Sequence, residues 1–137
     1  MWIVYALLSA IFASLVAIFA KVGIKGVDSD LATAIRTSII LFITWGIVLF
    51  KGSFSTINTL SKHNWLFIVL SAVATGLSWL FYFRALQIGK ASVVAPIDKL
   101  SVALTLVLAA LFLGEHLSVK EMVGAGLIVV GALVLVF

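Results

Sequence analysis

The sequence predicts an all-α membrane protein in which five helices cross the bilayer. Hydrophobic residues make up 64% of the 137-residue chain and charged residues only 10%, and the mean hydropathy is +1.34. Water-soluble domains carry about 25% charged residues, so this chain could not cover itself with a hydrated surface. A spanning helix needs about 20 mostly apolar residues. Five such stretches and their short links account for residues 1–137 as a single membrane domain.

The apolar stretches define the expected spans and links. We expect spans at residues 2–20, 31–50, 65–84, 93–113 and 121–137. The link 21–30 holds two lysines, two aspartates and two glycines, and Ser29 or Asp30 is placed to cap the second span. Residues 87–92 predict a tight connection. In the last link, Ser118 and Glu121 have the spacing of a capping box at the start of the fifth span.

The link 51–64 is the longest, and Phe54, Ile57 and Leu60 recur in it at the spacing of a short helix. We expect such a helix to lie at the membrane surface. Trp65 and Tyr82, near the ends of the third span, fit the aromatic belt of membrane proteins, whereas Trp45 and Trp79 lie deeper.

Polar side chains follow helical spacing in three expected spans. They are Thr33, Thr37 and Thr44, then Ser71, Thr75, Ser78 and Tyr82, then Asp98, Ser101 and Thr105. A single hydroxyl is best explained by a hydrogen bond within its own helix. Three stripes that each carry a charge or an aromatic ring favour a hydrated cavity among spans one to four. The residues predicted to line it and bind a ligand are Asp98, Lys99, Arg36, Trp79, Tyr82, Thr75, Trp45 and Thr37.

The fourth span contains a helix breaker, an acid and a base, namely Pro96, Asp98 and Lys99. Hydrocarbon does not solvate ions, so both charges must face protein, a cavity or each other. Successive helical residues point about 100° apart, which argues against a direct pair. We therefore expect Asp98 to pair with Arg36, Arg84 or Lys99 of a second chain. Pro96 has no backbone N–H and is expected to break the helix near the acid.

Small residues gather in the fifth span, at Gly124, Gly126 and Gly131. Because small residues let membrane helices approach closely, this span is predicted to be a packing or dimerisation helix.

Several classes of function are not expected. The chain has no cysteine, and its two histidines have no partner at metal-ligand spacing, so neither disulfides nor a metal site is predicted. The net charge of +4 comes from scattered residues with no continuous basic stripe, which argues against nucleic acid. No nucleophile or acid–base pair points to an enzyme, and no cofactor is expected.

Five crossings place the two termini on opposite sides of the membrane. The links on the N-terminal side carry three lysines, and those on the other side also carry three. Such a balance is what a chain that inserts in both orientations needs. Counting every basic residue gives six against three and favours an extracellular N-terminus.

Five short segments lie between residues 84 and 118, and their order and spacing are characteristic of a known repeat. They are Arg84-Ala85-Leu86, Gly89-Lys90-Ala91-Ser92, Val94-Ala95-Pro96-Ile97, Leu111-Phe112-Leu113-Gly114-Glu115 and Leu117-Ser118. With the glycine-rich fifth span, they resemble the EamA-type repeat of the drug/metabolite transporter superfamily. The resemblance is strong in the C-terminal third of the chain. The first two spans match mainly in length and spacing.

The resemblance implies a secondary transporter of the plasma (inner) membrane that exports amino acids or other small metabolites. Family members typically have ten spans, as two five-span repeats of opposite orientation, so a single repeat implies an antiparallel homodimer with alternating access. Asp98 and Lys99 stand where many relatives are uncharged, which favours a charged or zwitterionic solute. We hypothesise that Asp98 takes up and releases a proton during the cycle.

Other functions remain open. A lipid-carrier flippase subunit of the same superfamily also needs a polar groove, and a multidrug exporter is another possibility. Small multidrug-resistance proteins use a glutamate in their first span, which this chain lacks, so cation export by that route is not expected. A non-transporting membrane partner that assembles with another protein is the alternative from a different class.

Overall fold

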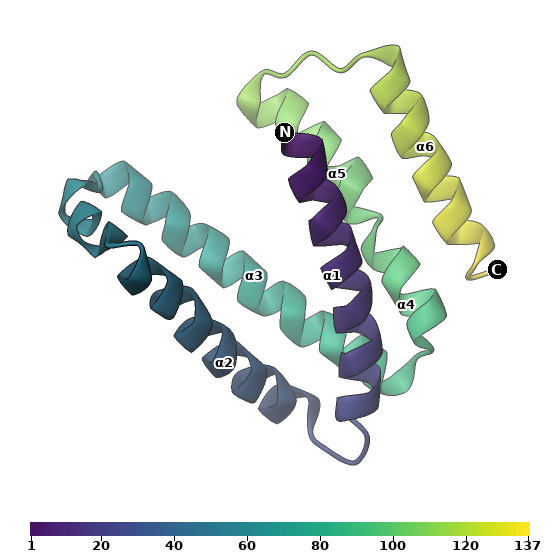
Figure 1. Ribbon diagram of the computed structural model, residues 1–137. Coiled ribbons are helices and arrows are strands. Elements are labelled where there is room, and N and C mark those ends of the chain that lie inside the picture. The colour runs from purple at the N-terminus through teal and green to yellow at the C-terminus, as the bar shows by residue number, and fades with distance from the viewer. The chain divides into compact units, whose positions relative to one another are not determined.

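All regular elements of the chain are helices in a computed structural model that describes residues 1–137 (Figure 1). The helices are α1 (Trp2–Gly23), α2 (Ser29–Phe50), the 3₁₀-helix η1 (Ser53–Thr59), α3 (Lys62–Ile88), α4 (Ala91–Asp98), α5 (Ser101–Leu108), the π-helical turn η2 (Ala109–Leu113) and α6 (Val119–Val134). Four stretches are long and apolar enough to cross a membrane: α1, α2, α3, and residues Ala91–Leu113, which include α4, α5 and η2. These confirm four of the expected spans. Helix α6 has 16 residues, fewer than the ~20 that a span needs.

Few side chains are buried. Those that are lie at Ala17, Ile24, Ser29, Thr33, Phe83, Leu86 and Ala132. Large apolar side chains such as Phe42 and Phe81 are 76% and 73% exposed. Exposing so much apolar surface to water is unfavourable, whereas lipid tails solvate it readily. The exterior is therefore that of a membrane protein.

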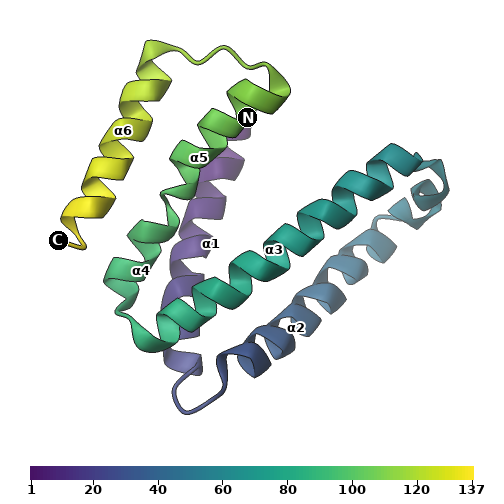
Figure 2. The same cartoon turned by 180° about the vertical axis from the view of Figure 1, so that it is seen from behind.

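The chain forms two compact units, Ala20–Gln87 and a second that combines Met1–Phe19 with Ile88–Phe137. In the Ala20–Gln87 unit, α2 and α3 run side by side and are joined through η1 (Figure 2). The opposite end of α3 is hydrogen-bonded to the end of α1 and to the turn that follows it. The ammonium of Lys21 donates to the carbonyl of Leu86, and the amide of Gln87 donates to the carbonyl of Val27 at 2.8 Å.

The N-cap of α2 differs from the prediction. Asp28, rather than Ser29 or Asp30, caps the helix, and its carboxylate accepts hydrogen bonds from the backbone N–H groups of Asp30 and Leu31, both at 3.0 Å. The helix begins at Ser29, two residues earlier than the predicted span, and Ser29 is fully buried. The side chain one residue upstream is then the one that reaches the unpaired N–H groups of the first turn.

The link between α2 and α3 contains the short helix expected from its apolar spacing, as the 3₁₀-helix η1. It starts after Gly52, whose φ of 68° lies in the left-handed region that glycine adopts without strain. Helix α3 has 27 residues, longer at both ends than the predicted span. Only Gly89 and Lys90 separate it from α4, which confirms the tight connection.

In the other unit, α6 packs against both α4 and α5. Helix α6 begins with the predicted capping box: the Ser118 hydroxyl accepts from the Glu121 backbone, and the Glu121 carboxylate accepts from the Ser118 backbone at 2.7 Å. Before this link, η2 ends at Gly114, with a φ of 67°. The glycine thus ends the helix in the left-handed conformation typical of C-terminal caps.

Removing the Ser118 hydroxyl should loosen the first turn of α6. We expect Ser118→Ala to lower the free energy of unfolding by about 1 kcal/mol, because an N–H of that turn loses its acceptor. Thermal unfolding of the purified chain in detergent measures the effect. Ser118→Thr, which keeps the hydroxyl, should unfold near the wild-type temperature. Equal unfolding temperatures for Ser118→Ala and the wild-type chain would contradict the capping role.

Candidate functional site

The fourth expected span is interrupted in its first half. Helix α4 ends at Asp98 and α5 begins at Ser101, so that Lys99 and Leu100 form the break. Across it, the N–H of Lys99 donates to Pro96 at 3.0 Å and that of Leu100 donates to Ile97 at 2.9 Å. These bonds reach back three residues rather than four, which tightens the chain as a helix ends. A discontinuous helix was expected and is present.

The position of the break differs from the prediction, because Pro96 lies inside α4 and the interruption follows three residues later. The proline ring conflicts with the carbonyl four residues before it, here that of Ser92. Ser92 lies in the first turn of α4, so the carbonyl that loses its helical donor to the proline is at the start of the helix and not in its middle. The helix therefore continues past the proline and ends at the charged residues.

The two charges at the break pair with each other. The ammonium of Lys99 lies 3.1 Å from a carboxylate oxygen of Asp98. The prediction that Asp98 and Lys99 do not pair with each other was therefore wrong. Pairing of Asp98 with Arg36, Arg84 or the lysine of a second chain stays a prediction. The angular argument assumed a continuous helix, but Lys99 lies outside both helices and its long side chain folds back to the acid. The pair stays accessible, with 54% of the Lys99 side chain and 36% of the Asp98 side chain exposed.

A second charged group lies in the Ala20–Gln87 unit. The guanidinium carbon of Arg36 on α2 is 4.4 Å from the ring centroid of Trp79 and 4.8 Å from that of Phe83, both on α3. These are cation–π contacts. The Nη1 atom of Arg36 is buried and has no hydrogen-bond partner. Tyr82 is close enough to Arg36 to interact with it electrostatically. The structure thus brings together three of the predicted site residues, Arg36, Trp79 and Tyr82.

Phe83 was missed because it reads as an ordinary apolar residue of a span. Its position four residues after Trp79 was the available signal, since such residues share a helix face. Phe83 is only 2% exposed, and its ring edge lies against Tyr82, with centroids 6.2 Å apart.

The threonine hydroxyls bond to their own helices. Thr37 donates to the carbonyl of Thr33 at 2.7 Å, and Thr75 donates to that of Ser71 at 2.8 Å. Thr33, Thr44 and Thr105 also donate to the carbonyl four residues before them. This is the simpler of the two explanations considered for the stripes. The donor of each hydroxyl is occupied, and only its lone pairs are available to a ligand.

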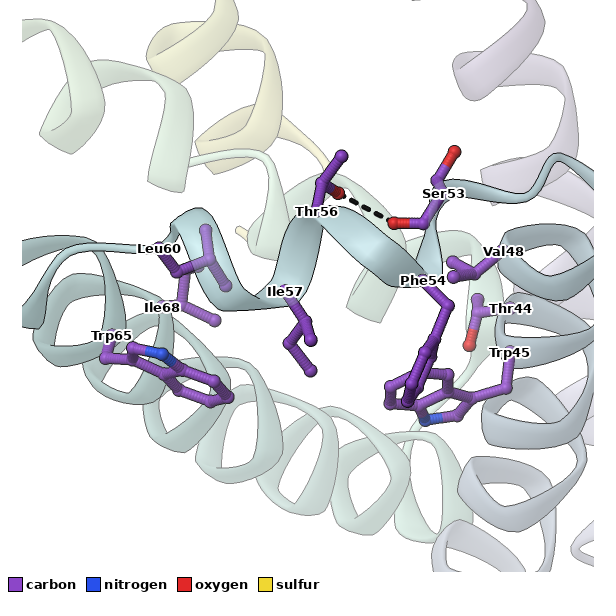
Figure 3. Close-up of a pocket in the computed structure, with 10 residues that line it drawn as sticks. All are labelled: Thr44, Trp45, Val48, Ser53, Phe54, Thr56, Ile57, Leu60, Trp65 and Ile68. Atoms are coloured by element: carbon purple, nitrogen blue, oxygen red, sulfur yellow. Dashed lines mark hydrogen bonds between the residues drawn. The ribbon is translucent and has the colours of Figure 1, made fainter.

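Trp45 lies in a different place from Arg36. It lines a largely apolar pocket of about 500 Å³ under η1 (Figure 3). The lining residues are Thr44, Trp45, Val48, Ser53, Phe54, Thr56, Ile57, Leu60, Trp65 and Ile68. Phe54 points from η1 toward Trp45, with ring centroids 5.8 Å apart. The regularly spaced apolar side chains of the link therefore have a structural role, because they pack η1 against the ends of α2 and α3.

The glycines of α6 do not mediate its packing within the chain. A methyl group placed on Gly124, Gly126 or Gly131 would meet no atom within 4 Å. Instead, Ala132 is buried. At about 100° per residue, Gly124 and Gly131 share a flank to one side of Ala132, while Gly126 lies on the opposite flank. The flank of α6 that holds Gly124 and Gly131 is therefore open.

Comparison with known proteins agrees with these features. The EamA-like transporter family matches residues 1–137. A Sinorhizobium sp. protein named "Uncharacterized transporter in cobO 3'region" is 48% identical over 134 residues, which cover 98% of this chain and 95% of that protein. An uncharacterized protein of Methanocaldococcus jannaschii is 32% identical over 97% of this chain and 94% of its own length. No solved structure matches the chain significantly. Together with the apolar helices and the interrupted span, these matches show that the chain belongs to the EamA-like transporter family of membrane proteins.

Proposed function

We propose that the chain is one five-span repeat of a secondary transporter that exports small charged or zwitterionic metabolites, such as amino acids, across the plasma (inner) membrane. Two copies in opposite orientation form the working carrier. The observation that carries the proposal is the exposed Asp98–Lys99 pair at the break between α4 and α5. Within a membrane, such a pair needs water or a polar ligand around it.

An interrupted helix suits this role for a physical reason. Where α4 ends and α5 begins, the backbone leaves the regular α-helical ladder and is held by hydrogen bonds that reach back three residues. Irregular backbone is tolerated at membrane depth only where it lines a cavity or is buried in protein. Broken helices in secondary transporters place backbone groups and ionic side chains at the solute site. The Asp98 carboxylate would then face an ammonium group of the solute.

The fifth span of the proposal combines α6 with the residues that follow it. Helix α6 covers 16 residues, and the apolar sequence continues through Leu135, Val136 and Phe137. From Met122 onward this stretch contains no charge. At ~1.5 Å per residue it is long enough to reach across most of the ~30 Å hydrocarbon layer.

Two features support the antiparallel homodimer. Three lysines fall in the links on each side of the proposed membrane, so positive charge gives little preference for either orientation. In addition, Gly124 and Gly131 lie on an open flank of α6, where a second helix could approach closely.

Removing both charges of the pair should strongly reduce transport and leave the fold intact. We expect purified chain in vesicles to move amino acids, and Asp98→Asn combined with Lys99→Gln to lower the flux at least about tenfold, equivalent to about 1.4 kcal/mol. The double change leaves no unpaired charge in the membrane, so thermal stability should hold. If Asp98 carries a proton, Asp98→Asn alone should also remove the response to a pH gradient.

Glu115→Gln is the matched control, because Glu115 is an exposed acid outside the helices. It should transport like the wild-type chain. Wild-type flux in the double variant would refute the role of the pair. Flux of hydrophobic drugs or lipid carriers instead of amino acids would assign the alternative carriers. No flux of any solute from the purified chain would favour a non-transporting assembly partner.

Single cysteines should label from both faces of the membrane. The chain has no cysteine of its own. Ser55 in η1 and Ser92 at the start of α4 are exposed, follow two and three proposed crossings, and tolerate a neutral Ser→Cys change. Ser118 is unsuitable because it caps α6. With dual orientation, an impermeant thiol reagent outside intact cells should modify about half of each variant.

The two cysteines control for each other. In a single orientation, one of them should react fully from outside and the other not at all. That result would exclude the antiparallel homodimer, while the transport assay above would still decide whether the chain is a carrier.

A further inference from the structure

Arg36 is a charged residue with no charged partner. It lies inside α2, seven residues after the helix begins at Ser29 and thus about 10 Å along its axis. That depth exceeds the headgroup layer, which is about 5–8 Å thick on each side. The Ala20–Gln87 unit contains only two acids, Asp28 and Asp30. Asp28 caps the start of α2, and Asp30 accepts a hydrogen bond from Ser29.

Two aromatic rings fix the guanidinium in place. Trp79 and Phe83 are four residues apart on α3, and both rings lie within 5 Å of the guanidinium carbon of Arg36. Contact with a π-face stabilises the charge but provides no hydrogen-bond acceptor in the plane of the guanidinium. The rings also cover Arg36, so that its Nη1 atom is buried without a partner.

A buried donor with no acceptor is costly, and more so when it is charged. Native proteins rarely keep such a group unless a ligand, an ion or water completes it. The missing partner must be an acceptor, and an anion would also balance the charge. A planar carboxylate fits best, because it accepts two parallel hydrogen bonds from one guanidinium. Because the Nη1 atom is buried, its pairing with an anion would be stronger than in water.

We propose that Arg36 binds the carboxylate of the solute, in a site whose walls are Trp79 and Phe83. This inference rests on the proposed transport function, since it names the solute class as carboxylate-bearing metabolites. Arg36 makes the charged contact, and the two rings position it. The site lies in the Ala20–Gln87 unit and is built from α2 and α3 alone.

Binding of matched carboxylates and amides tests the site. The probes are zwitterionic amino acids and their amides, which differ only in the carboxylate. Tryptophan fluorescence of the full chain in an uncharged detergent reports binding, because Trp79 lies at the site. Each amide should bind about 10-fold to 100-fold more weakly than its amino acid, the loss expected for a charge-assisted pair. Trp79→Phe, which keeps a ring, should remove the fluorescence response.

Variants of Arg36 and a matched arginine locate the effect. Arg36→Gln should bind acid and amide equally, and Arg36→Lys should keep part of the preference because a lysine offers charge without the planar fork. Arg84→Gln is the control, since Arg84 is an exposed arginine on α3. It should keep the full preference. Thermal unfolding checks that each variant folds. If Arg36→Gln does not fold, the reduced preference for acid over amide in Arg36→Lys tests the site instead.

Several results would overturn the inference. They are an equal affinity of the wild-type chain for acids and amides, a preference that survives in Arg36→Gln, and the absence of binding by any acid. A fluorescence response to phosphatidylglycerol or to inorganic phosphate, but not to amino acids, would assign Arg36 to a phosphate instead. Binding without vesicle flux would refute the transport function and leave the carboxylate site standing. Vesicle flux without a preference for carboxylates would refute the carboxylate site and leave the transport function standing.

Discussion

Hydrocarbon cannot solvate an ion, and this constraint explains both unusual features of the chain. At the break between α4 and α5, the constraint is met within the protein, because Lys99 and Asp98 lie 3.1 Å apart. At Arg36 it is met only in part, since two rings hold the guanidinium while one nitrogen lacks an acceptor. The two sites therefore differ in one respect. The Asp98–Lys99 pair contains both charges, whereas Arg36 has no charged partner in its unit and could take one from a ligand.

Local sequence rules predicted most of the fold. Apolar length located four spans, the Ser118–Glu121 spacing predicted the capping box, and the spacing of Phe54 and Ile57 predicted η1. Each of these depends on neighbours within a few residues. The cap of α2 was assigned wrongly because Ser29 is buried by tertiary packing, which no local pattern reveals. The fifth crossing depends on α6, whose helical part is shorter than the apolar sequence.

The candidate site was predictable as a set of residues but not as a set of contacts. Composition singled out Arg36, Trp79, Asp98 and Lys99, since charges and deep aromatics are rare in such a chain. Their partners depend on geometry. Asp98 pairs with its neighbour because the helix ends there, and Arg36 meets Phe83 as well as Trp79 because α2 lies alongside α3. Residue spacing alone predicts neither where a helix is interrupted nor which residues of two neighbouring helices meet.

Helix α3 is longer than the hydrocarbon layer of a membrane is thick. Its 27 residues extend about 40 Å, whereas the hydrocarbon layer is about 30 Å thick. A helix that exceeds the layer must lean or protrude. Trp79 and Phe83 are carried by this helix, and Arg36 is carried by the shorter α2. The cation–π contacts of Arg36 therefore depend on a helix that is longer than the hydrocarbon layer is thick.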